Sequence, residues 1–249
     1  MILLVNAANR AAFPDLLDDL FRARHEVFVE SKGWEDLRSA DARERDAFDR
    51  ADSVYLITIE DGEVVAGARL TGADGPTLAA TLLPELFEDA PPRGGDVLEL
   101  SRLFDRTAAL DPVTPAILEL LAAAAEFARL VGARGLLMIA DLSLVQAMLS
   151  WGAQAEPLGL PRRTRDGTLI AVMHHLSQRA ERNLRRALGL EPALLWWADK
   201  PGDPARTIAA ILRIDPLTRD WTPPGDLTPL QRSRLSPHAL AEAVERPGA

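Results

Sequence analysis

Residues 54–70 read VYLITIEDGEVVAGARL, and this stretch decides the expected fold. Two apolar runs, residues 54–59 and 64–70, flank the turn Glu60-Asp61-Gly62, and Asp-Gly between apolar runs is a strong signal for a β-hairpin. Side chains alternate between the two faces of a strand. Arg69 therefore projects from one defined face of the predicted hairpin.

Elements with their own signals lie on both sides of this hairpin. Upstream, apolar residues at helical spacing predict a helix over residues 12–28, and the highly charged segment 34–52 is predicted to be a loop. Downstream, we expect strands at 97–104, 135–140 and 169–176, a helix capped by Thr114 that runs through 117–131 and ends at Gly132, and a short helix at 142–150. Strands and helices alternate here, so the predicted fold class is α/β (α+β), with a mixed central sheet flanked by helices.

The composition changes after about residue 176. One more amphipathic helix is followed by a segment with many prolines that contains Trp196, Trp197 and Trp221. Because tryptophan is costly to leave in water, we expect this segment to pack on the main domain, with a frayed end. We predict a main domain at residues 1–178 and a C-terminal extension at residues 179–249.

Charge and composition exclude several classes of function. The formal net charge of -9 argues against nucleic acid as a partner, and the basic stretch 179–186 is interpreted as a solvated helix face. The chain has no cysteine, its histidines lack metal-ligand spacing, and it has no glycine-rich phosphate loop, so no metal and no bound cofactor are predicted. The apolar start is too short for a signal peptide and no run reaches membrane length, so we expect a cytoplasmic protein that does not contact the membrane.

Three carboxylates precede the hairpin in the pattern Glu44-x-Asp46-x-x-Asp49. Neighbouring carboxylates raise one another's pKa unless a cation lies among them, and Arg24 and Arg69 are candidates for that cation. A solvated acidic loop is the simpler alternative. Together with the arginines and nearby aromatic residues, however, the set is typical of a pocket for a zwitterionic, cationic small molecule.

Two aromatic residues near these charges have both a core and a site interpretation. Phe28 lies four residues after Arg24 and shares its helix face, where an arginine over a core phenylalanine is the alternative. Trp34 follows Gly33 and is interpreted as core or as an aromatic face for a sulfonium or an adenine ring, two roles that do not exclude each other.

Glu99 is the most informative single residue, because its neighbours in residues 97–104 are mostly aliphatic. An ionisable side chain in such surroundings is costly unless it is paired or used. A salt bridge to Arg69 on a neighbouring strand is the structural alternative. Strict alternation places Glu99 and Arg102 on opposite faces, so either a β-bulge interrupts the strand or the two residues have different roles.

These positions together resemble the acyl-homoserine-lactone synthases, the LuxI-type autoinducer synthase family. The resemblance covers about residues 1–176 and rests on Arg24-x-x-x-Phe28, Gly33-Trp34, Glu44-x-Asp46-x-x-Asp49, Tyr55, Gly67-x-Arg69-Leu70, Leu83-Pro84-x-Leu86-Phe87 and Glu99-x-Ser101-Arg102. It implies a fold related to the GNAT acyltransferases, with a V-shaped gap between two central strands that receives an acyl thioester. It also implies synthesis of a quorum-sensing signal, in which the α-amine of S-adenosylmethionine, a substrate, attacks the thioester. Its carboxylate then closes the lactone and expels methylthioadenosine.

The resemblance and this chemistry imply roles for the same residues. Glu99 is the expected general base for the amine, with Glu44 as the second choice. Tyr55 is counted with the catalytic residues, and with Phe28 and Trp34 it is expected to wall the nucleoside and the thioester. The expected substrate-binding residues are Arg24, Phe28, Trp34, Asp46, Asp49, Arg69, Ser101 and Arg102.

The acyl donor stays open between acyl carrier protein and acyl-CoA. Members of the family commonly offer basic residues near 145–155 to an acidic carrier protein, and residues 145–151 contain none. The absence of basic residues favours acyl-CoA. Against acyl-CoA, no glycine-rich pyrophosphate loop follows the Glu99 strand, and the usual donor of the family slightly favours the carrier protein. The position where a family threonine often accompanies 3-oxo acyl groups falls near Ala140 or Asp141, which disfavours 3-oxo chains.

Two other functions stay open. One is a GNAT-like N-acyltransferase with a different amine acceptor, which would release no methylthioadenosine. The other is a non-catalytic domain that binds a ligand or a partner.

Overall fold

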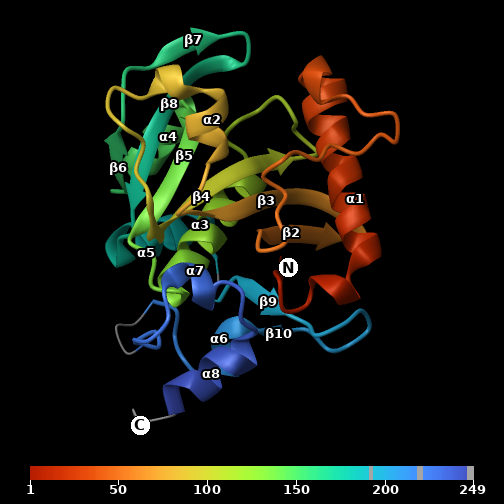
Figure 1. Cartoon of the computed structure of the whole chain (residues 1–249), viewed down its shortest axis with the longest axis vertical. Coiled ribbons are helices and arrows are strands. Elements are labelled where there is room, and N and C mark those ends of the chain that lie inside the picture. Colours follow the sequence, from red (N-terminus) through yellow and green to blue (C-terminus); the bar gives the residue numbers. More distant parts are fainter. Residues whose placement is uncertain (191–192, 218–220, 246–249) are drawn as a thin grey trace.

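One large mixed sheet organises the chain, seen in a computed structural model that describes residues 1–190, 193–217 and 221–245 (Figure 1). Its strands follow one another across the sheet in the order β10 (Arg206–Thr207), β9 (Leu195–Trp197), β1 (Ile2–Val5), β2 (Val54–Glu60), β3 (Glu63–Ala73), β4 (Gly94–Asp105), β5 (Gly135–Asp141), β8 (Gly167–His175) and β6 (Gln154–Pro157), with β7 (Arg162–Thr164) paired to β8. The predicted mixed α/β fold is confirmed.

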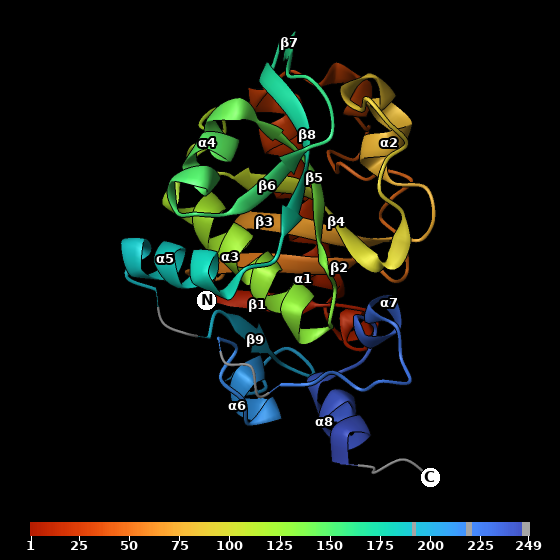
Figure 2. The same cartoon turned by 90° about the vertical axis from the view of Figure 1, so that its left-hand side faces the viewer.

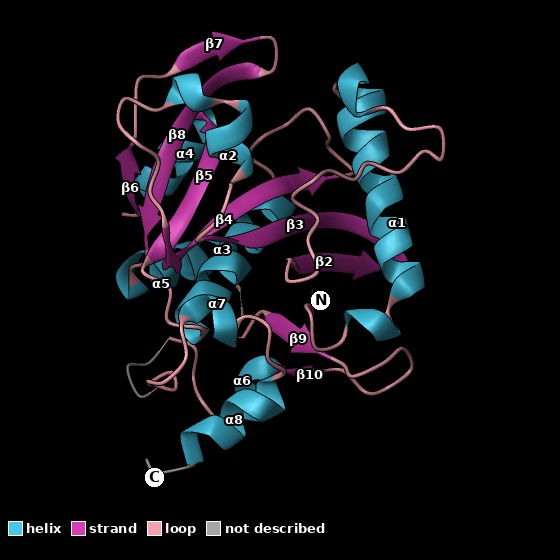
Figure 3. Ribbon diagram, in the orientation of Figure 1, coloured by secondary structure: helices cyan, strands magenta, loops and turns pink. Residues whose placement is uncertain are grey.

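Helices cover both faces of this sheet (Figure 3). They are α1 (Pro14–Arg24), α2 (Leu78–Leu82), α3 (Pro115–Leu130), α4 (Leu142–Ser150), α5 (Gln178–Leu188), α6 (Ile208–Leu212), α7 (Pro229–Arg232) and α8 (Pro237–Glu245). Single 3₁₀ turns lie at Arg10–Ala12, Glu35–Leu37 and Pro84–Leu86. Figure 2 shows α3 and α1 on opposite sides of β2 and β3. Alternate residues of these strands accordingly enter two separate apolar cores, one under each helix.

The predicted hairpin is confirmed. β2 and β3 pair in antiparallel fashion with Tyr55 opposite Arg69. Asp61 and Gly62 in the turn have φ values of 50° and 86°. Positive φ at both central residues matches the right-handed twist of the two strands, which explains the Asp-Gly sequence.

The helix predicted at residues 12–28 consists of two parts. Regular α-helical geometry runs from Pro14 to Arg24 and then widens into a π-helical segment at His25–Ser31. Such widened turns are frequent at functional sites. This one carries Phe28, which is buried.

β4 contains the bulge that its charged residues require. Arg69 pairs with Ser101 and Gly67 pairs with Phe104, so β4 has one residue more than β3 in this interval. Arg102 has a φ of 52°, a left-handed conformation that is costly for a residue other than glycine. The bulge breaks the alternation and lets Arg102 reach the same group of carboxylates as Arg69.

β4 and β5 run parallel and then diverge. Their pairing begins at Val97 with Gly135 and ends at Leu100 with Met138. Both strands continue, β4 to Asp105 and β5 to Asp141. The gap between two central strands that the resemblance implies lies at this divergence (Figure 1).

The C-terminal extension continues the main sheet. β9 pairs with β1 in parallel, and α6 and α8 lie beyond that edge of the sheet (Figure 2). Trp197 is buried, and the indole N–H of Trp221 donates to the carbonyl of Leu130 at 2.7 Å. The described residues around Trp197 and Trp221 therefore pack on the main sheet and on α3, and the predicted frayed end lies outside the described residues.

The expectation of a solvated face for the basic stretch 179–186 was wrong for part of it. Arg185 lies 2.5 Å from Glu126 of α3, and Glu181 lies 2.8 Å from Arg129 of the same helix. Arg185 and Glu181 are buried. The reason is that α5 packs on α3, where each buried charge is paired with a charge of opposite sign on the other helix.

The described part of the chain holds no helix that combines the length and the apolar character needed to span a membrane.

Candidate active site

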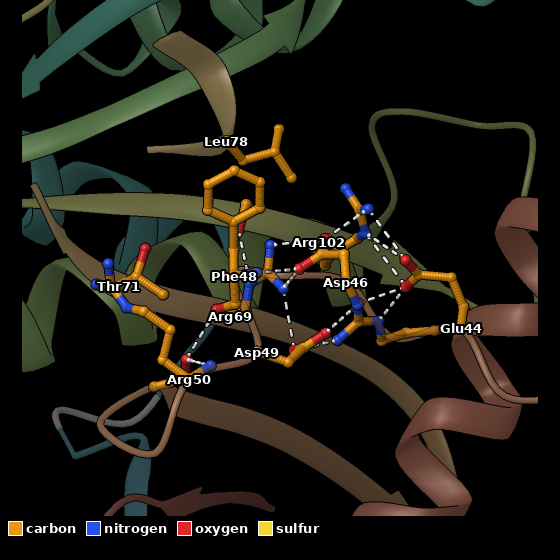
Figure 4. Close-up of polar contacts among 12 residues, drawn as sticks. Glu44, Asp46, Phe48, Asp49, Arg50, Arg69, Thr71, Leu78 and Arg102 are labelled. Carbon is orange, nitrogen blue, oxygen red and sulfur yellow. Dashed lines mark hydrogen bonds and ion pairs between the residues drawn. The ribbon is translucent and has the colours of Figure 1, made fainter. Parts of the chain in front are cut away.

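A buried network of three arginines and three acids lies beside β3 and β4 (Figure 4). The arginines come from three elements, the end of α1, β3 and the bulge in β4. All three acids come from the irregular segment before β2. The members are Arg24, Arg69, Arg102, Glu44, Asp46 and Asp49.

Arg24 and Arg102 hold Glu44 between them. Arg24 Nε donates to Glu44 Oε2 at 2.6 Å, and Arg102 Nη2 donates to Glu44 Oε1 at 3.0 Å. Arg24 also donates from Nη1 to Asp49 at 2.8 Å. The carboxylate of Glu44 is thus held between two guanidinium groups.

Arg69 holds the other two acids. Its Nη1 lies 2.5 Å from Asp46 Oδ1 and 3.0 Å from Asp49 Oδ1, and its Nε donates to the hydroxyl of Ser101 at 3.1 Å. Arg102 completes the network through Asp46 Oδ2 at 2.7 Å. Burial acts to raise the pKa of Asp49, but the Arg24 and Arg69 guanidinium groups hold it well below its usual range. Positive and negative charges in the network are equal in number.

Tyr55 contacts this network through Asp49. Its hydroxyl donates to Asp49 at 3.0 Å, and its ring meets Phe21 edge to face. Burial and the neighbouring Asp49 raise the pKa of Tyr55, so the hydroxyl keeps its proton at neutral pH. The structure thus places Tyr55 as a support for Asp49, away from the cavity wall where the sequence led us to expect it.

A cavity of about 330 Å³ lies at the divergence of β4 and β5. One end is polar and aromatic, with Phe28, Lys32, Trp34, Glu99, Ser101 and Arg102. The other end is apolar and includes Leu100, Leu103, Ile117, Met138 and Leu144, which lie in or against the core under α3. The cavity therefore offers a charged compartment and an apolar compartment side by side.

Glu99 is buried at the polar end. Its carboxylate accepts the backbone N–H groups of Ala79 at 2.7 Å and Leu78 at 2.9 Å, and the hydroxyl of Thr71 lies at 3.4 Å. The alternative of a salt bridge to Arg69 is not formed, because Arg69 is committed to Asp46 and Asp49. Burial raises the pKa of Glu99, although the two N–H groups act in the opposite direction. A carboxylate of this kind is suited to accept a proton.

Comparison with known proteins identifies the family. Residues 10–184 match the sequence profile described as autoinducer synthase. The chain belongs to the autoinducer synthase family. The isovaleryl-homoserine lactone synthase of Bradyrhizobium diazoefficiens is 33% identical over 177 residues, which cover 69% of this chain and 78% of that protein. The acyl-homoserine-lactone synthase of Pseudomonas aeruginosa is 27% identical over 78% of this chain and 96% of its own length.

Solved structures of autoinducer synthases share the fold. BjaI, described as a CoA-dependent acyl-homoserine lactone synthase and solved with MTA, matches with a TM-score of 0.72 and 30% identity. That match covers 80% of this chain and 93% of BjaI. MesI, also described as CoA-dependent, matches with a TM-score of 0.71 and 27% identity over 78% of this chain and 98% of MesI.

The predicted site residues of this autoinducer synthase separate into two sets. Five of them line the cavity, and they are Phe28, Trp34, Glu99, Ser101 and Arg102. The other six are outside the lining and form the network and its support, namely Arg24, Glu44, Asp46, Asp49, Tyr55 and Arg69.

An aromatic pair forms the third part of the site. The rings of Phe28 and Trp34 stack with their centres 5.0 Å apart and their planes at 17°. The Arg102 guanidinium lies 5.6 Å from the centre of the Phe28 ring, and the Lys32 ammonium lies 5.7 Å from it. This stack is a surface that attracts cations.

Sequence reasoning missed some residues at this site. Lys32 lines the cavity and was detectable, because it directly precedes the Gly33-Trp34 pair. The amides of Leu78 and Ala79 carry no sequence signal, since any residue supplies a backbone N–H. Asp166 accepts a hydrogen bond from Trp34, which lies 132 positions away in the chain. The spacing of residues along the sequence does not predict a contact over that separation.

Proposed function

We propose that this chain acts as an acyl-homoserine-lactone synthase with Glu99 as the general base and acyl-CoA as the acyl donor. As an autoinducer synthase it is an acyltransferase that uses S-adenosylmethionine as a substrate and makes a quorum-sensing signal. One observation carries the assignment of Glu99. It is a buried carboxylate whose hydrogen-bond partners among the described residues are neutral groups, and it shares a cavity with an aromatic stack and an apolar wall.

The first step needs a base. The ammonium of S-adenosylmethionine must lose a proton before its nitrogen can attack, and Glu99 accepts that proton directly or through one water molecule. The free amine then attacks the thioester carbonyl, so that a C–N bond forms, the C–S bond breaks and the thiol leaves. A raised pKa makes Glu99 a stronger base than an exposed glutamate.

The second step needs a folded substrate. The carboxylate attacks its own γ-carbon, and the C–S bond to the sulfonium breaks and releases methylthioadenosine. Arg102 contacts Glu44 and Asp46 through Nε and Nη2 and lines the cavity, so we assign its guanidinium to the substrate carboxylate. Phe28 and Trp34 supply the aromatic surface for the sulfonium and the adenine. Positioning therefore accounts for most of this step.

The acyl thioester occupies the gap between β4 and β5. Beyond Leu100 and Met138 these strands no longer pair with each other, so backbone groups at their facing edges are available to the thioester. The apolar end of the cavity, with Leu103, Ile117 and Leu144, receives the acyl chain.

The network acts as a scaffold for this cavity. Because its charges balance internally, it adds no net charge to attract or repel the substrate. Its effect is to hold Arg102 in a left-handed bulge and to fix Ser101 beside Arg69. We assign Arg24, Glu44, Asp46, Asp49 and Tyr55 positioning roles on this basis.

Two observations support acyl-CoA over an acyl carrier protein. BjaI and MesI, which match this chain over most of their length, are described as CoA-dependent. Residues 145–151 contain no lysine or arginine for an acidic carrier protein, and the whole chain is acidic.

The test is product analysis with the purified chain and S-adenosylmethionine. Acyl-CoA thioesters and acyl carrier proteins of matched chain length are offered in parallel, and the products are identified by mass spectrometry. We expect an acyl-homoserine lactone, with methylthioadenosine and CoA in equal amounts. Turnover with the carrier protein alone would overturn the donor assignment. An amide product without methylthioadenosine would identify an N-acyltransferase, and no product from either donor would contradict the synthase assignment.

A further inference from the structure

The aromatic wall of the cavity is tied to a distant hairpin. The indole Nε1 of Trp34 donates to Asp166 Oδ1 at 2.8 Å, although 132 positions separate the two residues. Asp166 lies in the turn between β7 and β8. This hydrogen bond connects the segment after α1 with the far side of the cavity.

The hairpin that carries Asp166 also forms the other wall. Thr164 and Leu169 of this hairpin line the same cavity as Trp34, and so does Asp166 itself. The hairpin therefore contacts the same cavity as the aromatic stack.

The turn is held in a fixed place. Asp141 ends β5, and its Oδ2 accepts the N–H of Thr168 at 3.2 Å while its Oδ1 accepts the N–H of Ser143 at the start of α4. Gly167 has a φ of 120° and packs directly against Asp141, so a side chain there would collide with the carboxylate. The position of Asp166 is thus set by the body of the sheet.

A cation reinforces the connection. The Lys32 ammonium lies 5.7 Å from the Phe28 ring centre and 5.9 Å from that of Trp34. The charges of Asp166 and Asp141 attract this ammonium. The indole, the ammonium and the two acids thus form one set at the cavity.

We propose that Asp166 is a positioning residue that holds the Trp34 indole in its stack on Phe28, so that the β7–β8 hairpin sets the affinity for the nucleoside. The proposal rests on the proposed function, in which Phe28 and Trp34 wall the nucleoside. An indole held in one rotamer before binding loses less conformational freedom when the ligand arrives. Asp166 touches neither reacting atom, so its loss should change binding far more than turnover.

The experiment measures the dissociation constant of methylthioadenosine by calorimetry and the steady-state KM and kcat for S-adenosylmethionine. For Asp166→Ala we expect a rise of about threefold to tenfold in both the dissociation constant and KM, with kcat within about twofold, as for one partly exposed hydrogen bond. Asp166→Asn keeps an oxygen acceptor, and it should restore both constants to within about twofold of the native values. If Asp166 had only a structural role, Asp166→Ala would lower kcat and the melting temperature, and the selective rise in the dissociation constant and KM would not be seen.

Two further variants complete the test. Trp34→Phe keeps a ring but removes the N–H, so adding Asp166→Ala to it should have no further effect on methylthioadenosine binding. Trp34→Phe also serves alone if Asp166→Ala does not fold. Asp36→Ala is the matched control, because Asp36 is exposed, lies two residues from Trp34 and makes no hydrogen bond or ion pair with any described residue.

The outcomes separate the two proposals. Native-like binding and KM in Asp166→Ala, in a preparation whose native chain makes lactone, would overturn only the role of Asp166. A loss in Asp166→Asn equal to that in Asp166→Ala would do the same, because it would trace the effect to charge instead of the hydrogen bond. A native chain that neither binds methylthioadenosine nor makes lactone would contradict the proposed function itself.

Discussion

The network and the cavity each contain a buried glutamate, and the two glutamates differ in the charge of their partners. Glu44 is 0% exposed and Glu99 is 1% exposed. Two guanidinium groups bind Glu44, whereas backbone N–H groups and one hydroxyl bind Glu99. Burial therefore does not distinguish a structural acid from a reactive one. The two glutamates differ in the charge of their partners, and this difference is the basis of the roles that we propose for them.

The replacement Glu99→Gln should have the largest effect. It keeps the size of the side chain and removes the proton acceptor, so we expect kcat/KM to fall by about 10²- to 10⁴-fold. The measurement is methylthioadenosine release under initial-rate conditions. Glu85→Gln, at an exposed position near α2, is the control and should keep native activity. Activity of Glu99→Gln within about threefold of the native chain would remove Glu99 from the mechanism.

The replacement Arg69→Ala tests the other side of the comparison. It leaves the three acids of the network with two arginines and so one buried negative charge uncompensated, and we expect a loss of about 3–5 kcal/mol in the free energy of unfolding. Urea denaturation measures it. Arg45→Ala in the same segment removes an arginine whose side chain is 50% exposed, and it should cost less than about 1 kcal/mol. Equal losses in the two variants would show that the network is not a scaffold.

The two regions should also respond to acid at different pH. Glu99 must be ionised to act as a base, and its pKa is raised, so kcat/KM should fall about tenfold per pH unit below an apparent pKa that lies above the ordinary 4.5. Asp49 has a lowered pKa in the folded chain, so the stability it contributes is lost only as the pH falls below the ordinary 3.8.

The pH dependence of the stability contributed by Glu99 is opposite to that of Asp49. Its raised pKa means that its contribution to stability is present below pH 4.5 and is lost as the pH rises through the folded value. As the pH is lowered, activity should therefore decline before the protein unfolds. A pH–rate profile set beside circular dichroism at each pH checks this order, and a coincident loss of both signals would contradict it.

The replacement Tyr55→Phe should have the smallest effect. It removes one hydrogen bond to Asp49 and keeps the ring against Phe21, so we expect a loss of about 0.5–1.5 kcal/mol in the free energy of unfolding. We expect kcat within about threefold of the native value, because Tyr55 lies outside the cavity lining. A fall of about 10²-fold or more in kcat at unchanged stability would return Tyr55 to the catalytic set.

Local signals in the sequence predicted much of the fold. The Asp-Gly hairpin, the Thr114 cap and the helix at residues 142–150 appear as expected, because each depends on residues close together in the chain. β9 and β10 were not predicted, since two or three residues have no measurable period. β9 is a strand because β1 offers an edge to pair with, and β10 then pairs with β9; these edges exist only in the folded sheet.

The site shows the same division. The spacing of Glu44, Asp46 and Asp49 and the position of Glu99 were visible in the chain, and the resemblance assigned them to one family. Their partners were not visible. Whether an acid meets an arginine or a backbone N–H depends on contacts between elements 20 or more positions apart.

The sequence by itself determined which residues carry charge or an aromatic face, where the hairpin turns, and which family the chain resembles, because these follow from local chemistry and order. Only the tertiary structure decided that the two glutamates have different partners, that Arg102 turns back at a bulge, and that Asp166 meets Trp34. The physical reason is that the strength of a charge or a hydrogen bond depends on its neighbours in space, and chain order does not specify those neighbours.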